Sequence, residues 1–130
     1  MSELRTLENF GKALKQLREF VAMPVMNDRD RAGIIQAFEF TFEQCWKTFQ
    51  KIAAEEGIAA ASPRQSLLAA VQLQLIGATD EETWLGMLQD RNRTSHLYED
   101  SVAREIAHNV VERYLPLFVA AFDRCSRALP

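Results

Sequence analysis

Residues 91–98, RNRTSHLY, bring together two arginines, an asparagine, two hydroxyl residues, a histidine and a tyrosine. The guanidinium of an arginine is planar and permanently charged, and it matches the oxygen atoms of a phosphate group. A histidine has an ordinary pKa of about 6.5, so it exchanges a proton near neutral pH. Arg91 and His96 therefore point to chemistry on a phosphate.

RNA is a phosphate ester that such a pair could cleave, because RNA supplies its own 2′-hydroxyl nucleophile. A histidine acting as acid or base on that reaction typically contributes about 10²–10⁴-fold. An arginine stabilises the charge of the pentavalent phosphorane. This reaction needs no metal or cofactor, and we expect neither here. The two Cys and two His of the chain do not stand at metal-ligand spacing.

The position of Arg91 relative to His96 depends on the helix that carries them. Residues five apart on an unbroken α-helix are separated by about 140°, so these two would not share a face. Asn92, Thr94 and Ser95 are poor helix formers whose side chains compete for backbone groups. We therefore predict a break or tightened turn, which could bring Arg91 and His96 to one point. The same residue types also make an ordinary polar joint between two helices, and residue types alone leave both interpretations open.

Apolar residues recur at three- and four-residue steps over five segments, which predicts five helices and no strand. The predicted helices cover residues 2–21, 29–56, 62–76, 79–90 and 99–128. Gly57 is expected to end the second helix and Gly77 the third. Long helices with short links predict an all-α, antiparallel up-and-down bundle of four to five helices, forming a single domain over residues 1–130.

Local signals refine these helices. Ser62-Pro63-Arg64-Gln65 and Thr79-Asp80-Glu81-Glu82 each have the pattern of a capping box. Pro116 is expected to kink the last helix near Leu115. The inner face of the third helix is expected to carry Leu67, Leu68, Val71 and Leu75. The inner face of the last helix is expected to carry Val102, Ile106, Val110, Tyr114, Leu117, Ala121, Phe122 and Cys125.

The length, the composition and the net charge of the chain limit the class of protein. The chain has 130 residues, 48% of them hydrophobic, and a net charge of −3, which argues against broad coating of nucleic acid. We expect no membrane span and no signal peptide, and hence a cytoplasmic protein. Cys45 and Cys125 are far apart with apolar neighbours, so we interpret both as reduced core thiols.

Arg91, His96 and Tyr98 fit the pattern R-x-x-x-x-H-x-Y, and this stretch resembles the signature of the HEPN superfamily. More closely, nearly the whole chain resembles the nucleotidyltransferase substrate-binding protein family, a HEPN branch. Three blocks in order carry the resemblance: GIIQAFEFTFEQCWKTF (33–49), SPRQSLLAA (62–70) and ETWLGMLQDRNRTSHLYED (82–100). The resemblance implies a HEPN-like bundle that pairs as a two-fold homodimer.

The resemblance also implies a function. In related HEPN toxins, the motif Arg and His form a metal-independent ribonuclease site across the dimer interface. A small minimal nucleotidyltransferase acts as antitoxin and, in some systems, attaches AMP to the motif Tyr. By resemblance, Arg91 binds phosphate, His96 is the acid or base, and Tyr98 is the candidate modification site. Asn92, Arg93 and Ser95 are expected to support them, Asn92 by orienting the pair and Arg93 by adding charge to a cleft formed by two copies.

We therefore expect a HEPN-family toxin, an endoribonuclease neutralised by its cognate nucleotidyltransferase. The alternative is a non-catalytic subunit that binds a substrate or nucleotide for that nucleotidyltransferase. A third interpretation is a dimeric bundle with an interaction role alone. RNA or a nucleotide is the expected ligand, and we expect no DNA. Two further features stay open: Arg29 and Arg31 could contact a nucleotide or form a solvated helix start, and Phe40, off the core stripe, could meet a partner subunit.

Overall fold

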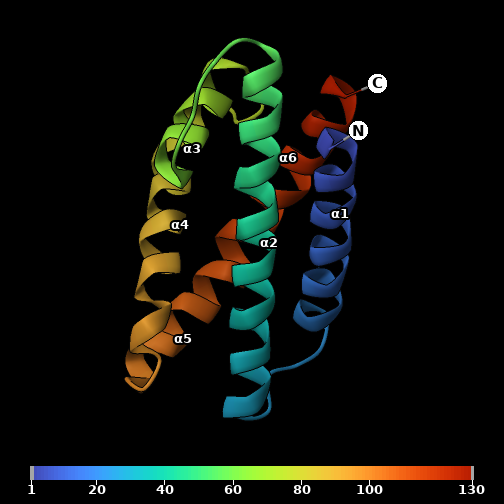
Figure 1. Cartoon of the computed structure of the whole chain (residues 1–130). Helices are drawn as coiled ribbons and strands as arrows, with labels where there is room; N and C mark the ends of the chain where they lie inside the picture. The colour runs from blue at the N-terminus through green and yellow to red at the C-terminus, as the bar shows by residue number, and fades with distance from the viewer. Residues whose placement is uncertain (1, 130) are drawn as a thin grey trace.

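The computed structural model describes the backbone of residues 2–129 and the side chains of residues 5–129. Helix α2 runs through the middle of an all-helical bundle and packs against α1, α3, α5 and α6 (Figure 1). The predicted helical bundle is confirmed. The helices are α1 (Ser2–Val21), α2 (Asp28–Glu55), α3 (Pro63–Gln72), α4 (Glu81–Arg93), α5 (Asp100–Asn109) and α6 (Leu115–Ala128).

The long helices alternate in direction. Helices α1 and α4 run down in the view of Figure 1, while α2 and the rod formed by α5 and α6 run up. The α1–α2 connection and the α4–α5 connection therefore lie at the same lower end of the bundle. Residues 91–98 are thus placed beside the start of α2. No helix within residues 2–129 is both long enough and apolar enough to cross a membrane.

Local sequence signals explain the bounds of α2. The Asn27 side chain accepts a hydrogen bond of 2.8 Å from the backbone N–H of Asp30, which caps the first turn. Gly57, just past the other end, adopts a φ of 77°, where a residue with a Cβ would be strained. The helix predicted over residues 29–56 is confirmed to within one residue at each end.

An aromatic cluster forms the centre of the core. The ring of Phe118 lies 5.7 Å from Trp84, 6.2 Å from Phe38 and 6.4 Å from Phe10, measured between ring centroids. Helices α1, α2, α4 and α6 each supply one of these rings. The Trp84 and Phe10 rings meet Phe118 edge to face, an arrangement that adds to the stability that burial alone gives. These four helices are therefore joined through one shared aromatic ring, that of Phe118.

Phe118 corrects the predicted inner face of the last helix. Leu117 was expected there, yet Phe118 is fully buried and Leu117 only partly. A π-turn over Val110–Tyr114 explains the difference, since it places one extra residue in the turn and moves the buried face along by one. The N–H of Leu115 donates to the carbonyl of Val110, five residues back. The irregularity expected near Leu115, just before Pro116, is confirmed, and it takes the form of this π-turn.

The third helix differs from its prediction. It ends at Gln72 instead of just before Gly77, because Gln74 adopts a left-handed φ of 63° that stops the helix. Leu68 is 41% exposed, so its expected inward position is wrong, whereas its neighbour Leu67 is buried. The cap at Ser62 is confirmed: its hydroxyl accepts from the N–H of Gln65.

The second expected capping box, at residues 79–82, does not form. A short 3₁₀ turn over Ala78–Asp80 leads directly into α4. Asp80 takes the cap position with helical backbone angles and makes no capping hydrogen bond from its side chain. A capping side chain reaches the N–H groups of the first turn from an extended backbone, and the backbone of Asp80 is not extended.

Cys45 and Cys125 are buried free thiols, as expected. Burial raises the pKa of Cys125 to about 12, and burial raises the pKa of Cys45 well above its ordinary value. Both thiols therefore stay protonated and unreactive near neutral pH. Their place is in the core, away from residues 91–98.

The two neighbouring leucines of α3 test this packing. We expect Leu67→Ala to lower the free energy of unfolding by about 2–5 kcal/mol, because it leaves a cavity in the core. Leu68→Ala, the matched control with the same chemistry, should cost less than about 1 kcal/mol because its side chain is already partly in water. Urea unfolding followed by circular dichroism measures both, and equal costs for the two variants would contradict the assigned face.

Candidate functional site

The helix break predicted within residues 91–98 is present. Helix α4 ends at Arg93, a 3₁₀ turn covers Thr94–His96, and α5 begins at Asp100. The Thr94 hydroxyl donates to the carbonyl of Arg91 at 2.7 Å, and the Ser95 hydroxyl to that of Asn92 at 3.4 Å. These hydroxyls bond to two of the last carbonyls of α4. In a continuing helix those carbonyls would accept from backbone N–H groups, so the hydroxyls compete with the helix for them.

Arg91 lies in a small cluster that joins the turn to α2. Its Nη1 atom is 3.1 Å from the Thr94 hydroxyl and 3.3 Å from Oε2 of Glu39. The Thr94 hydroxyl is itself 3.2 Å from the same carboxylate oxygen. We call Glu39, Arg91 and Thr94 the Glu39 cluster. Among residues 5–129, whose side chains the structure describes, Nε and Nη2 of Arg91 have no hydrogen-bond partner. Since the side chain is 35% exposed, one edge of the guanidinium is open to an anion.

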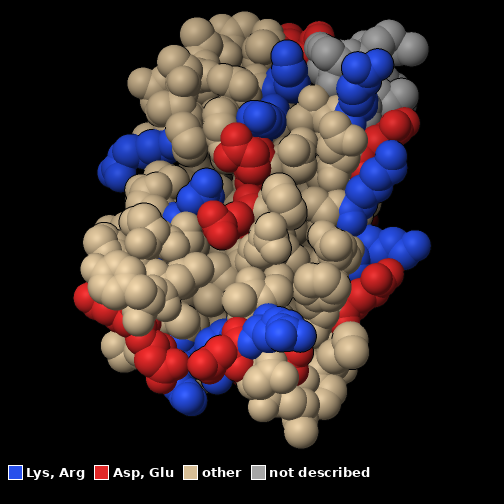
Figure 2. Space-filling view, turned by 60° about the horizontal axis from the view of Figure 1, so that its bottom comes forward, with Lys and Arg blue, Asp and Glu red and all other residues tan. Residues whose placement is uncertain are grey.

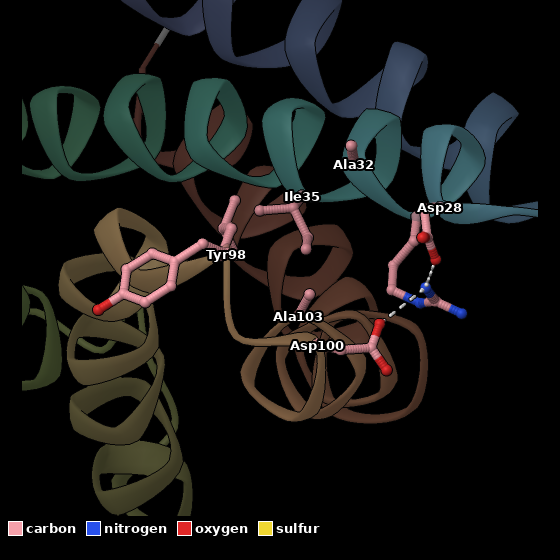
Figure 3. Close-up of a pocket in the computed structure, with 8 residues that line it drawn as sticks. Asp28, Ala32, Ile35, Tyr98, Asp100 and Ala103 are labelled. Atoms are coloured by element: carbon pink, nitrogen blue, oxygen red, sulfur yellow. Dashed lines mark hydrogen bonds and ion pairs between the residues drawn. The ribbon is translucent and has the colours of Figure 1, made fainter.

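His96 and Tyr98 form a second, exposed pair. Nδ1 of His96 is 3.3 Å from the Tyr98 hydroxyl, and the two rings meet edge to face at 5.9 Å. Tyr98 is 79% exposed. In Figure 3 its ring points away from the neighbouring pocket, with the hydroxyl at the outer end. Both rings are therefore accessible to a large partner or substrate.

Arg91 and His96 make different contacts within one chain. Across the described residues no hydrogen bond joins them: Arg91 contacts α2 through Glu39, while His96 contacts Tyr98. Asn92 and Ser95 are exposed on the same turn. The convergence of the motif Arg and His at one point stays a prediction.

Arg93 is held in a structural contact. Its Nη1 donates to Oδ1 of Asp90 at 2.9 Å, and its Nη2 pairs with Glu105 of α5. Two carboxylates thus share this guanidinium, which reduces the charge it offers to a ligand. The contact fixes the end of α4 against α5.

A pocket of about 310 Å³ lies between the start of α2 and the start of α5, next to Tyr98 (Figure 3). On its wall, Arg31 is 2.7 Å from Asp28 and 4.0 Å from Asp100. Its side chain is mostly buried, so Arg31 is neither a solvated residue nor an open cation. Arg29 is exposed, as a solvated helix start would be.

Charge is mixed on the face that Figure 2 presents. Lys and Arg side chains alternate with Asp and Glu around a broad uncharged area, and this face carries no continuous basic patch. This face therefore offers a polyanion only local attraction.

The sequence matches the family described as "Nucleotidyltransferase substrate binding protein like" over residues 5–127. The chain belongs to this family. The resemblance stated from the three sequence blocks is therefore confirmed. No curated protein sequence matches the chain at significant similarity.

Solved structures share the fold of this chain. A protein from Thermus thermophilus is 31% identical, with a TM-score of 0.78, over 93% of this chain and 99% of that one. A chain of a mutant toxin–antitoxin complex described as MntA–HpeT has 14% identity and a TM-score of 0.78, covering 96% of this chain and 97% of that one. A chain of the tri-AMPylated Shewanella oneidensis HEPN toxin in complex with MNT antitoxin has 17% identity and a TM-score of 0.77, covering 96% of each. At these identities the last two show a shared fold.

In this member of the family, a buried carboxylate organises the chain around the motif. Asp90 accepts hydrogen bonds from the Tyr114 hydroxyl at 2.5 Å and from Nδ2 of Asn109 at 3.0 Å, besides that from Arg93. We call Asp90, Arg93, Asn109 and Tyr114 the Asp90 cluster. Burial and the hydrogen bond to Asp90 raise the pKa of Tyr114, so its phenol remains a neutral donor.

The π-turn makes the Asp90 cluster possible. Asn109 and Tyr114 are five residues apart, and on an α-helix they would point about 140° apart. In a π-turn, residue i+5 lies about one turn above residue i, so both side chains reach the same carboxylate. The irregular turn in the last helix and the end of α4 are therefore linked through Asp90.

Sequence reasoning missed both Asp90 and Glu39. A signal for Asp90 exists: it stands three residues after Met87 and six after Trp84, on the buried stripe of α4. A carboxylate on an apolar stripe needs buried partners. Glu39 has no such local signal, because its partners belong to a distant segment of the chain.

Replacing Asp90 should destabilise the fold strongly. Asp90→Ala leaves a hydroxyl, an amide and a guanidinium without their acceptor, and we expect a loss of about 3–5 kcal/mol in the free energy of unfolding. Asp123→Ala is the control, since Asp123 forms an exposed pair with Arg127 and should cost less than about 1 kcal/mol. Denaturant unfolding of both variants gives the comparison, and a mild effect at Asp90 would show that the cluster contributes little to stability.

Proposed function

We propose that this chain is the toxin of a toxin–antitoxin pair and acts as a metal-independent endoribonuclease that a small nucleotidyltransferase neutralises. The observation that carries the proposal is the exposed turn after α4. It presents an open guanidinium edge at Arg91 and an accessible imidazole at His96, in a family described as nucleotidyltransferase substrate binding protein like. The solved toxin structures of the same fold support this proposal.

The proposed reaction is internal transfer at an RNA phosphate. The 2′-hydroxyl attacks the adjacent phosphorus, so a P–O2′ bond forms and the P–O5′ bond breaks. One imidazole accepts the proton of the 2′-hydroxyl, and an imidazolium donates a proton to the departing 5′-oxygen. The products are a 2′,3′-cyclic phosphate and a 5′-hydroxyl. Arg91 stabilises the negative charge of the phosphorane.

A homodimer supports this reaction better than a single chain. Arg91 and His96 make separate contacts within one copy, so a two-fold axis near the turn would supply two of each to a shared cleft. Phe40 is 54% exposed on α2, beside Glu39. An exposed aromatic next to the site is a typical component of a subunit interface. The two-fold pair also gives the reaction separate imidazoles for the acid and the base.

Tyr98 is the proposed point of regulation by the nucleotidyltransferase. Transfer of AMP from ATP would join the Tyr98 oxygen to the α-phosphorus and release pyrophosphate. Because that oxygen lies 3.3 Å from Nδ1 of His96, the added phosphodiester would stand against the imidazole and cover it. The Shewanella oneidensis toxin of the same fold carries three AMP groups, which supports this assignment.

A second candidate function is a non-catalytic subunit that binds substrate or nucleotide for the nucleotidyltransferase. The family description favours it directly. In that case Arg91 binds a phosphate of the ligand, and His96 contributes a hydrogen bond without transferring a proton. The two functions differ in whether RNA is cleaved.

The test of cleavage compares the two histidines of the chain. We expect His96→Ala to reduce the rate of RNA cleavage by about 10²–10⁴-fold, because it removes the acid or base. His108→Ala is the matched control, since His108 is exposed on α5 away from the turn. Cleavage of a labelled RNA and growth after induction are measured, with circular dichroism to verify the fold. A wild-type protein that cleaves no RNA would favour the binding subunit.

The test of modification uses the chain expressed with and without its nucleotidyltransferase. We expect intact-mass measurement to show one or more AMP units on the wild type only after co-expression. Tyr98→Phe should lose them, because it removes the accepting hydroxyl and keeps the ring. Tyr114→Phe, which removes a buried hydroxyl, should stay modified. AMP retained on the Tyr98→Phe variant would place the modification elsewhere.

A further inference from the structure

Glu39 places a carboxylate at the cation that is proposed to bind the substrate phosphate. Its Oε2 lies 3.3 Å from Nη1 of Arg91, and it comes from α2, far from the motif in sequence. In the described structure no Lys side chain, and no Arg side chain other than Arg91, pairs with Glu39. The two side chains therefore neutralise each other in the free protein.

The contact is built so that it can be exchanged. The Arg91 and Glu39 side chains are 35% and 31% exposed, and pairs in contact with water are weak. The Thr94 hydroxyl carries one proton, and its nearer acceptor is the carbonyl of Arg91 at 2.7 Å, against 3.2 Å to Glu39. Glu39 therefore has one loose ion pair and one shared hydroxyl, with no contact that locks it in place.

A phosphodiester competes well for the same guanidinium. It offers two oxygens to two N–H groups of Arg91, whereas Glu39 approaches through a single oxygen and a single nitrogen. An anion that binds the open Nε and Nη2 edge also comes within a few ångströms of the Glu39 carboxylate, and the two negative charges repel. Binding thus requires Glu39 to move away or to tolerate that repulsion.

We propose that Glu39 sets the affinity of the Arg91 site for phosphate: its carboxylate is an internal competitor that the substrate phosphate displaces. This inference rests on the proposed function, since it takes Arg91 as the phosphate-binding residue. It assigns to α2 a direct influence on the site, in addition to the packing role of that helix. It also explains how an acidic protein limits its binding of other polyanions, because each must displace Glu39 or bind against its repulsion.

Glu43 provides a matched control on the same helix. It lies one turn further along α2, where its carboxylate is 3.3 Å from Nζ of Lys47 and accepts from Nε1 of Trp46 at 3.1 Å. Glu39→Gln and Glu43→Gln each remove one negative charge from α2 with little change in shape. An effect of net charge alone would appear equally in both variants.

The experiment measures binding of a short fluorescein-labelled 2′-O-methyl RNA by fluorescence anisotropy at low salt. The methyl group blocks the nucleophile, so the probe binds without being cleaved. We expect Glu39→Gln to lower the Kd by about five- to tenfold and Glu43→Gln to change it by less than about twofold. Arg91→Ala should weaken binding, and Glu39→Gln combined with Arg91→Ala should bind as weakly as Arg91→Ala alone.

The alternative role for Glu39 is to hold Arg91 in position, and it predicts the opposite sign. Unchanged or weaker binding by Glu39→Gln would overturn the proposal, as would equal gains in the two glutamine variants. An Arg91→Ala variant that binds like the wild type would overturn the proposal too, because RNA would then not bind through the Arg91 guanidinium for which Glu39 competes. With cleavable RNA, the Glu39→Gln variant should show a lower KM. A wild-type protein that cleaves no RNA would refute the proposed catalysis, and the binding comparison would still decide the role of Glu39.

Discussion

The buried carboxylate of Asp90 is the constraint around which this end of the bundle is arranged. A charge in an apolar core is tolerated only with several strong partners. Here the partners come from the end of α4, the end of α5 and the π-turn. The last helix must become irregular to deliver two of them to one point. The motif begins at the next residue, Arg91, and the turn follows at Thr94, so the position from which this segment leaves α4 depends on the cluster.

A second contact, between α2 and the turn, acts on function more than on stability. The Asp90 carboxylate and the Tyr114 side chain are buried and joined by a short hydrogen bond, whereas Glu39 and Arg91 are partly in water and their ion pair is longer. The Asp90 cluster is therefore suited to permanent support, and the Glu39 cluster to an exchangeable contact. The two clusters are adjacent through Asp90 and Arg91, so a rigid support carries a cation whose counter-ion can be replaced.

Sequence reasoning succeeded where the determining signals are local. The end of α2 follows from Gly57, and the break after Arg93 follows from hydroxyl residues that bond to nearby carbonyls. It failed where the outcome depends on distant partners. The π-turn that buries Phe118 in place of Leu117 forms together with the Asp90 cluster, and Glu39 meets Arg91 only after the bundle has assembled. The end of α3 was missed because Gln74 takes a left-handed conformation that its residue type does not announce.

The π-turn also bears on how related chains should be compared. A π-turn corresponds to one residue more than an α-helix needs over the same length. A relative that is one residue shorter within 110–114 would have a regular helix there, and its counterparts of Asn109 and Tyr114 would no longer share a face. Such a chain could keep every motif residue and still lack the support beneath the motif. A single gap in an alignment at this position would therefore indicate that the Asp90 cluster is not formed in the same way. The identities of the motif residues alone would not reveal this difference.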